Sequence, residues 1–271
     1  PHMPLADAPD KYLQMYDPDE IPLRPNTLVG GKLAYDENWF KIYLWDFLYY
    51  QEHLPHTKQL PEGFDLRHLT ALYYGLTTWV DDTVGRLMAN LEAHGLAEDT
   101  IVVFASDHGD NLGSHHAFNK GLLIEESIRV PLIFWGGLAP QANTAQVAQL
   151  IDIMPTLLEQ CGAEVPDTVQ GRALGPVLRG ERETLEENGA FIETSTGAIG
   201  LRTPDHLYGM QLEKDLRTIS NDGKCLYDLA ADPYEQRNLA GGTDTGLEAD
   251  FAQQLEQWNA QTPWLGEQNA G

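Results

Sequence analysis

The sequence is poor in cysteine and in positive charge, and each shortage argues against a class of protein. Its 271 residues include two cysteines, Cys161 and Cys225, which lie far apart and lack Cys-x-x-Cys spacing. This spacing argues against a zinc site or a disulfide framework and leaves room for one disulfide at most. The 41 Asp and Glu residues outnumber the 17 Lys and Arg residues, for a net charge of −24. Nucleic acid and anionic membranes would be repelled, so neither is an expected partner.

Long apolar runs are also missing. No run approaches the roughly 18 residues that a membrane-spanning helix needs, so no membrane span is expected. No signal-peptide pattern opens the sequence, and because the first residue is Pro1 this says nothing about where the protein works. The length suffices for a sizeable core, in one large domain or in a domain with a smaller appendage.

The hydrophobic pattern alternates between helical and strand-like segments. Apolar residues recur at helical spacing over 66–94, and Gly95 is suited to end that helix. Short apolar runs at 101–105 and 130–135 predict strands, with a short helix between them and another helix over 151–161. Alternation of this kind predicts an α/β layer with a mostly parallel sheet flanked by helices.

The pattern changes at about residue 186. Short strand-like runs separated by turn residues follow, and they predict a small antiparallel sheet. A last helix is expected over 247–258. We therefore divide the chain into a larger α/β part, residues 1–185, and a small carboxyl-terminal α+β subdomain, residues 186–271.

Ionisable residues crowd together where the strand at 101–105 ends, in "SDHGDNLGSHHAFNKG". Loops at the carboxyl ends of parallel strands line the ligand crevice of such folds. Asp107 offers carboxylate oxygens and His108 an imidazole nitrogen, so the pair suits a divalent cation. Oxygen ligands favour Ca²⁺, Mg²⁺ or Mn²⁺, and the nitrogen leaves Zn²⁺ open. Lys120 is placed to hold an anionic substrate.

Several stretches together resemble the sulfatase family of the alkaline-phosphatase-like superfamily. "DTIVVFASDHGDNLGSHHAFNKG", followed by "EESIRVPLIFWGG", carries most of the resemblance. "PHMP", "APDKYLQMYDPDEIPLRPN", "IDIMPTLLEQCGAEVPDTVQGRAL" and "LYDLAADPYEQRNLA" follow the family pattern in the same order. The resemblance covers nearly the whole chain and implies an alkaline-phosphatase-like sheet, represented here in part.

The resemblance implies roles for five residues. Asp107 and His108 match a pair of metal ligands, and the implied metal is Ca²⁺ first, with Mg²⁺ or Mn²⁺ as alternatives. Lys120 and His2 match residues that contact the sulfate group, and His2 would protonate the leaving oxygen. His115 matches a frequent family histidine and is a weaker candidate for substrate binding.

The resemblance also implies a nucleophile that this sequence does not contain. Sulfatases carry a Cys/Ser-x-Pro/Ala-x-Arg motif whose first residue is oxidised to formylglycine, and no such motif occurs in the 271 residues. The paired aspartates of the family's first strand are missing as well. Asp81 and Asp82 lie on the predicted long helix and are not expected to bind metal. We therefore expect the chain to be the carboxyl-terminal part of a sulfatase, inactive alone, with its nucleophile on an upstream segment.

Three functions remain open. The first is hydrolysis of a small-molecule or carbohydrate sulfate ester. The second is hydrolysis of a phosphonate or phosphate ester, because related enzymes share the Asp-His pair. The third is a non-catalytic sulfatase-like binding or structural protein. The aromatic stretch within residues 26–68 does not identify the substrate, because packing explains such residues as readily as ligand binding does.

Overall fold

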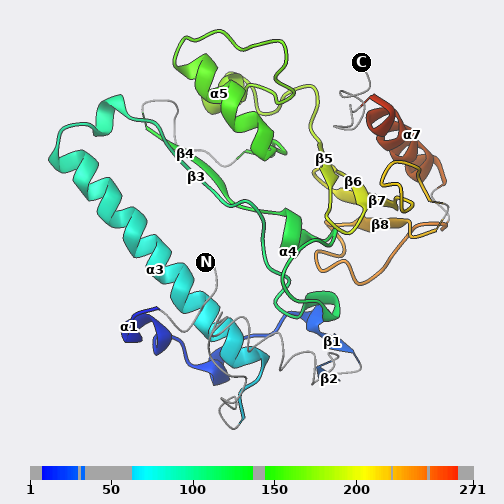
Figure 1. Ribbon diagram of the computed structural model, residues 1–271, viewed down its shortest axis with the longest axis horizontal. Helices are drawn as coiled ribbons and strands as arrows, with labels where there is room; N and C mark the ends of the chain where they lie inside the picture. Colours follow the sequence, from blue (N-terminus) through cyan, green and yellow to red (C-terminus); the bar gives the residue numbers. More distant parts are fainter. Residues whose placement is uncertain are drawn as a thin grey trace. The chain divides into compact units, whose positions relative to one another are not determined.

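The computed structural model describes residues 8–29, 32–33, 63–136, 144–220, 222–242 and 245–261 (Figure 1). His2 and most of the aromatic stretch in residues 26–68 therefore lie outside the described residues. The chain forms two compact units. The first contains residues 1–100 and 110–120, and the second contains residues 101–109 and 121–271.

The first unit is organised by one long helix, α3 (Leu66–Ala93), which matches the predicted helix. Asp65 caps its start, because the side chain accepts hydrogen bonds from two backbone N–H groups of the first turn. The buried residues of α3 pack against the short helix α1 (Asp10–Leu13) and against Phe118. The shorter elements of this unit are η2 (Pro18–Glu20), η3 (Pro25–Thr27), β1 (Leu28–Val29), β2 (Lys32–Leu33), η4 (Ala97–Asp99) and η5 (Ser114–His116).

The aspartates of "VDDTVG" lie on α3, as predicted. Asp82 accepts a hydrogen bond of 2.7 Å from the hydroxyl group of Tyr12 and forms an ion pair with Lys11. The Tyr12 hydrogen bond is the main cause that lowers the pKa of Asp82. Asp82 therefore links α1 to α3.

The second unit begins with a two-stranded ribbon of β3 (Val102–Ala105) and β4 (Leu132–Trp135). The strands pair antiparallel, with Val102 opposite Trp135. The sequence predicts a mostly parallel sheet, whereas these two strands form an antiparallel pair. A parallel pair needs a crossover connection, usually a long helix. Residues 106–131 contain only the short helices η5 and α4 (Glu125–Ile128).

The carboxyl-terminal sheet confirms the prediction of a small antiparallel sheet followed by a helix. Its strand order is β5–β6–β7–β8, and every neighbouring pair is antiparallel. Helix α7 packs its buried Phe251 and Leu255 with the buried side chains of β6 and β7. The bounds are β5 (Ala190–Glu193), β6 (Ala198–Arg202), β7 (His206–Gln211), β8 (Cys225–Asp228) and α7 (Thr245–Gln261). The predicted boundary at residue 185 remains a prediction.

A buried ion pair organises the segment between the ribbon and this sheet. Helix α5 (Ile153–Gln160) follows η6 (Leu150–Asp152), and α6 (Gly175–Leu178) comes later. The side chain of Asp152 is fully buried and lies 3.1 Å from Arg172 Nη2. It also accepts hydrogen bonds from the backbone N–H groups of Gln149 and Arg172. The Asp152 carboxylate thus connects the start of α5 to the loop that contains Arg172.

Both cysteines are free thiols. Within the described part of the chain, no helix combines the length and apolar character that a membrane span requires.

The Asp152→Asn substitution is expected to lower the free energy of unfolding by about 3–5 kcal/mol, because it leaves Arg172 without its charged partner. Urea unfolding followed by circular dichroism measures the change. Glu181→Gln is the matched control, since Glu181 pairs with Arg179 at the exposed surface. Equal stability of the two variants would contradict this account of the segment.

Candidate metal centre

Asp107 and His108 lie at the turn that follows β3, as predicted. The Asp107 carboxylate is exposed, and its Oδ1 accepts a hydrogen bond of 2.9 Å from the His108 backbone N–H. Its Oδ2 lies 3.4 Å from His108 Nε2. The two side chains thus bring an oxygen and a nitrogen within 3.4 Å of each other, close enough for one cation to contact both.

The other imidazole nitrogen of His108 is engaged by the backbone. His108 Nδ1 lies 2.8 Å from the carbonyl oxygen of Gly109. A carbonyl oxygen only accepts hydrogen bonds, so Nδ1 carries the proton. In a neutral imidazole Nε2 then has a free lone pair that faces the carboxylate. Metal-binding histidines commonly show this arrangement, in which one nitrogen is oriented by a carbonyl group and the other binds the ion.

The turn is held against α4 by a close backbone approach. Gly109 donates a hydrogen bond of 2.9 Å to the Ser127 carbonyl oxygen. A side chain at position 109 would overlap the carbonyl oxygen of Glu126, so only glycine fits there. This contact fixes the direction in which the turn leaves β3.

Lys120 and His115 belong to a tightly folded loop of the first unit. Backbone hydrogen bonds join Asn111 to Asn119 and Gly113 to Ala117 across this loop. The Lys120 side chain is exposed, and His115 is half-buried with a left-handed backbone (φ 50°). Since Asp107 and His108 belong to the second unit, the assignment of all four residues to one site stays a prediction.

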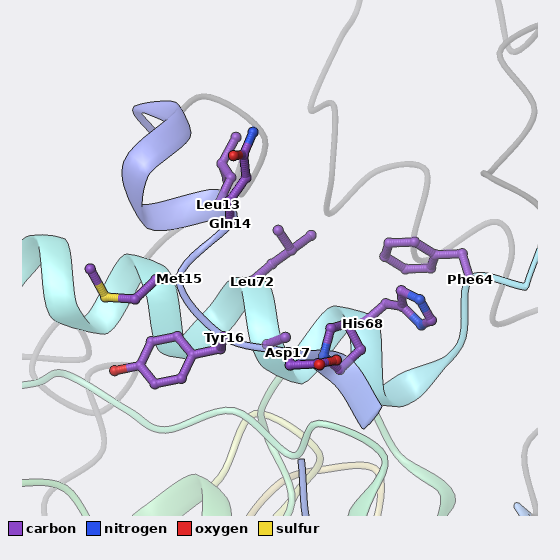
Figure 2. A pocket seen from close by; sticks show the side chains of 10 residues that line it. Leu13, Gln14, Met15, Tyr16, Asp17, Phe64, His68 and Leu72 are labelled. Carbon is purple, nitrogen blue, oxygen red and sulfur yellow. The ribbon is translucent and has the colours of Figure 1, made fainter. Parts of the chain in front are cut away.

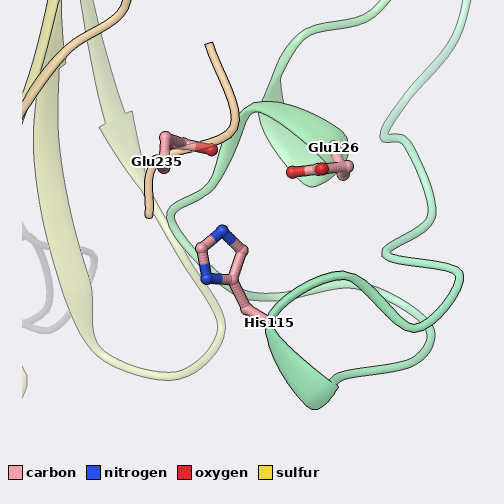
Figure 3. A group of neighbouring side chains, drawn as sticks. All are labelled: His115, Glu126 and Glu235. Atoms are coloured by element: carbon pink, nitrogen blue, oxygen red, sulfur yellow. The ribbon is translucent and has the colours of Figure 1, made fainter. Parts of the chain in front are cut away.

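One acidic residue escaped the sequence analysis. Glu235 is 2% exposed, and its Oε2 accepts a hydrogen bond of 3.0 Å from the Glu125 backbone N–H at the start of α4. Burial raises the pKa of Glu235 to about 8, and the nearby charge of Glu126 adds to the effect. Figure 3 shows the carboxyl groups of Glu126 and Glu235, and it also draws His115. Glu235 lies in "LYDLAADPYEQRNLA", a stretch that follows the family pattern but does not itself indicate that this glutamate is buried.

A pocket of about 490 Å³ lies in the first unit, between the chain after α1 and the first turns of α3 (Figure 2). Its lining mixes apolar side chains with Tyr16, Asp17 and His68. His68 Nδ1 lies 2.8 Å from the carboxylate of Asp65, the residue that caps α3. None of the predicted site residues that the structure describes lines this pocket.

Comparison with known families decides the identity of the fold. The sulfatase family matches residues 1–163, which is more than half of the chain. The chain belongs to the sulfatase family. A second family, described as the carboxyl-terminal part of N-sulphoglucosamine sulphohydrolase, matches residues 113–261. The two matches overlap in the segment that carries His115, Lys120 and α4.

Individual sulfatase relatives agree with this assignment. The chain is 31% identical over 258 residues to an ulvan-active sulfatase of Formosa agariphila, covering 89% of this chain and 42% of that protein. A phosphonate monoester hydrolase from Silicibacter pomeroyi has a similar structure, with a TM-score of 0.71, 27% identity, and coverage of 95% of this chain and 53% of that one. The chain therefore spans about half the length of the relatives it matches.

A third relative was solved in complex with its substrate, D-glucosamine-2-N,6-O-disulfate. It matches with a TM-score of 0.61 and 29% identity, over 76% of this chain and 42% of that one. The chain thus has the alkaline-phosphatase-like fold of the sulfatase family, although the strands described pair only antiparallel.

The raised pKa of Glu235 makes stability depend on pH. The folded state keeps the proton up to about pH 8, whereas the unfolded state loses it near the ordinary value of 4.5. The contribution of Glu235 to the free energy of unfolding is therefore largest below pH 4.5. It falls by up to about 1.4 kcal/mol per pH unit between pH 4.5 and about pH 8. Glu235→Gln keeps an oxygen acceptor for Glu125 and is expected to remove this slope. Unfolding temperatures from pH 5 to pH 8 measure it, and identical slopes for both proteins would contradict the assignment.

Proposed function

We propose that the chain is part of a sulfuric ester hydrolase that cleaves sulfate esters with the help of a divalent metal and a formylglycine nucleophile. Membership of the sulfatase family supports the reaction class. The observation that carries the proposal is the geometry of Asp107 and His108, in which the carboxylate Oδ2 and the imidazole Nε2 lie 3.4 Å apart.

These two residues fit a metal ion by their chemistry. A carboxylate oxygen and a neutral imidazole nitrogen repel each other through their lone pairs unless a proton or a cation lies between them. The ion proposed is Ca²⁺, with Mg²⁺ or Mn²⁺ as alternatives. When bound, it would offset the negative charge of the ester and polarise its S–O bonds. With two ligands from this chain, binding is weak unless further ligands come from elsewhere.

Lys120 and His2 are proposed to act on the sulfate group directly. The exposed ammonium group of Lys120 would hold an anionic sulfate oxygen and stabilise charge that develops on it. His2, outside the described residues, would donate a proton to the departing alcohol oxygen. His115 is a further candidate for hydrogen bonding to the substrate, with the weakest support of the three.

The nucleophile must come from outside these 271 residues. They contain no Cys/Ser-x-Pro/Ala-x-Arg motif, and covalent catalysis needs the group that this motif provides. The chain alone is therefore expected to hydrolyse esters at no useful rate. This proposal concerns the whole protein, of which the chain supplies part of the metal site and part of the sulfate site.

A sulfated carbohydrate is the substrate class with the most support. One of the two matching families is named for N-sulphoglucosamine sulphohydrolase, and one similar structure holds a sulfated glucosamine as its substrate. A phosphonate ester is the second candidate, because a phosphonate monoester hydrolase is among the similar structures. Both ester classes present an anionic group that a metal ion and a lysine can bind.

Substitution of either proposed ligand should weaken metal binding. For the 271-residue chain, Asp107→Asn and His108→Ala are each expected to reduce Ca²⁺ affinity by about tenfold or more. Isothermal titration with Ca²⁺, and with Mn²⁺ as a second ion, measures the affinity. Asp205→Asn is a control, since Asp205 directly precedes β7 in the carboxyl-terminal sheet region. Unchanged binding in both ligand variants would contradict the proposed centre.

Lys120→Ala in the full-length gene product is expected to lower kcat for a sulfate ester by about 10²–10³-fold, since one stabilising group for the developing charge is lost. Steady-state rates with a sulfated glucosamine, an aryl sulfate and a phosphonate monoester measure the loss and rank the substrates. Lys214→Ala is the matched control, because Lys214 is an exposed residue of the carboxyl-terminal sheet region. If Lys120→Ala leaves every rate unchanged, the assigned role of Lys120 is wrong.

A further inference from the structure

Glu235 is a buried carboxyl group that joins the loop after β8 to the start of α4. Its Oε2 accepts a hydrogen bond of 3.0 Å from the Glu125 backbone N–H, which is 110 residues away in the sequence. Its Oε1 is also buried, and among the described residues it has no hydrogen-bond partner. A buried carboxylate needs partners for both of its oxygens, so this site suits the neutral acid better than the charged form.

The groups around Glu235 also disfavour a negative charge on it. Burial raises the pKa of Glu235 to about 8, although the hydrogen bond from the Glu125 backbone acts in the opposite direction. A carboxylate oxygen of Glu126 lies within 4.8 Å of one of Glu235. The titratable groups that face Glu235 in the second unit are Glu125 and Glu126 of α4, Asp232 of its own loop, and Cys225 and Tyr227 of β8. Figure 3 also draws His115, of the first unit. The groups of the second unit are all acids, so loss of the proton would add a charge that they repel.

Helix α4 connects Glu235 to the turn after β3. The helix has four residues, of which Glu125 is the first and Ser127 the third. The Ser127 carbonyl oxygen accepts the hydrogen bond from Gly109, and the two backbones are so close that Gly109 has no room for a side chain. The Gly109 carbonyl oxygen lies 2.8 Å from His108 Nδ1. A continuous series of close contacts therefore leads from Glu235 to the imidazole, and a shift of α4 has to move the turn.

A second contact holds α4 independently of Glu235. Arg202 of β6 lies 3.0 Å from the Glu125 carboxylate, and both side chains are largely buried. This ion pair remains when Glu235 loses its proton. We therefore expect ionisation of Glu235 to shift α4 on the sheet, not to release it.

We propose that Glu235 is a positioning residue for the turn that carries Asp107 and His108. With its proton in place, Glu235 holds α4 where Ser127 meets Gly109, and without the proton α4 and the turn move. Metal binding at the Asp107–His108 pair would then weaken as the pH rises through about 8. This last consequence rests on the proposed function, whereas the movement of the turn does not.

Carbon-13 NMR of the metal-free 271-residue chain tests the movement without any measurement of activity. The carboxyl signal of Glu235 reports its own ionisation between pH 6.5 and pH 9.5, and the carbonyl signals of Ser127 and Gly109 report the contact between α4 and the turn. We expect all three signals to shift with one midpoint near pH 8. Carbonyl signals that stay constant while Glu235 ionises would overturn the proposal.

Three variants assign the transition to Glu235. Glu235→Gln keeps an oxygen acceptor and cannot ionise, so the shifts of the carbonyl signals should disappear. Glu126→Gln removes a nearby like charge and should lower the midpoint. Glu193→Gln is the matched control with an unchanged midpoint, because Glu193 is exposed on β5, at the opposite edge of the sheet from β8. Carbonyl shifts that persist in Glu235→Gln would contradict the assignment.

Calcium titration at pH 7 and pH 9 tests the consequence for metal binding. The Ca²⁺ affinity of the unmodified chain should fall with pH by about fivefold or more beyond any fall in Glu235→Gln, which shares every other titratable group. Equal pH dependence in the two proteins would refute the coupling of Glu235 to the metal centre. If neither protein binds Ca²⁺ while the carbonyl signals still follow Glu235, the positioning role stands and the proposed metal centre is wrong.

Discussion

The close approach of Gly109 to α4 is the constraint on which the second unit depends. The hydrogen bond from Gly109 to Ser127 leaves no room for a side chain, and it holds the turn that carries Asp107 and His108. The Gly109 carbonyl oxygen in turn fixes the proton of His108 on Nδ1. A backbone contact therefore leaves Nε2 as the imidazole nitrogen that lies beside the Asp107 carboxylate.

Helix α4 extends this constraint to the carboxyl-terminal sheet. Arg202 of β6 lies 3.0 Å from Glu125 in an ion pair that is largely buried, and Glu235 accepts a hydrogen bond from the Glu125 backbone. Gly121 is held by the turn between β5 and β6, because its carbonyl oxygen accepts a hydrogen bond from the Thr196 hydroxyl group. The small sheet thus supports the turn after β3 through α4, although no residue of the sheet was among the predicted site residues.

The sequence predicted local structure better than it predicted pairing. Helix α3 and the carboxyl-terminal sheet follow from patterns that neighbouring residues carry, namely helical periodicity and strands separated by turns. The antiparallel pairing of β3 with β4 was not predicted, because alternation of helices and strands does not specify which strands are neighbours or how they pair. Glu235 was missed because its burial depends on a contact with Glu125, 110 residues away. The pairing of Asp107 with His108 was predictable, since adjacent residues need only one turn to meet.

The net charge of −24 repels an anionic substrate at long range. At physiological ionic strength the Debye length is about 8 Å, so most of this charge is screened from a ligand at the end of β3. On the proposed function, the attraction felt close to the ester would come from Lys120 and from a cation at the Asp107–His108 pair.

Metal binding as proposed at the Asp107–His108 pair requires that His108 carry its proton on Nδ1 and present Nε2 to the ion beside the Asp107 carboxylate. Long-range ¹H–¹⁵N NMR of the histidine side chains, recorded before and during a titration with paramagnetic Mn²⁺, tests it most directly. We expect His108 to be protonated on Nδ1 without metal, and we expect its ring signals to be the first histidine signals that broaden as Mn²⁺ is added. A proton on Nε2, or broadening that begins elsewhere and spares His108, would contradict it.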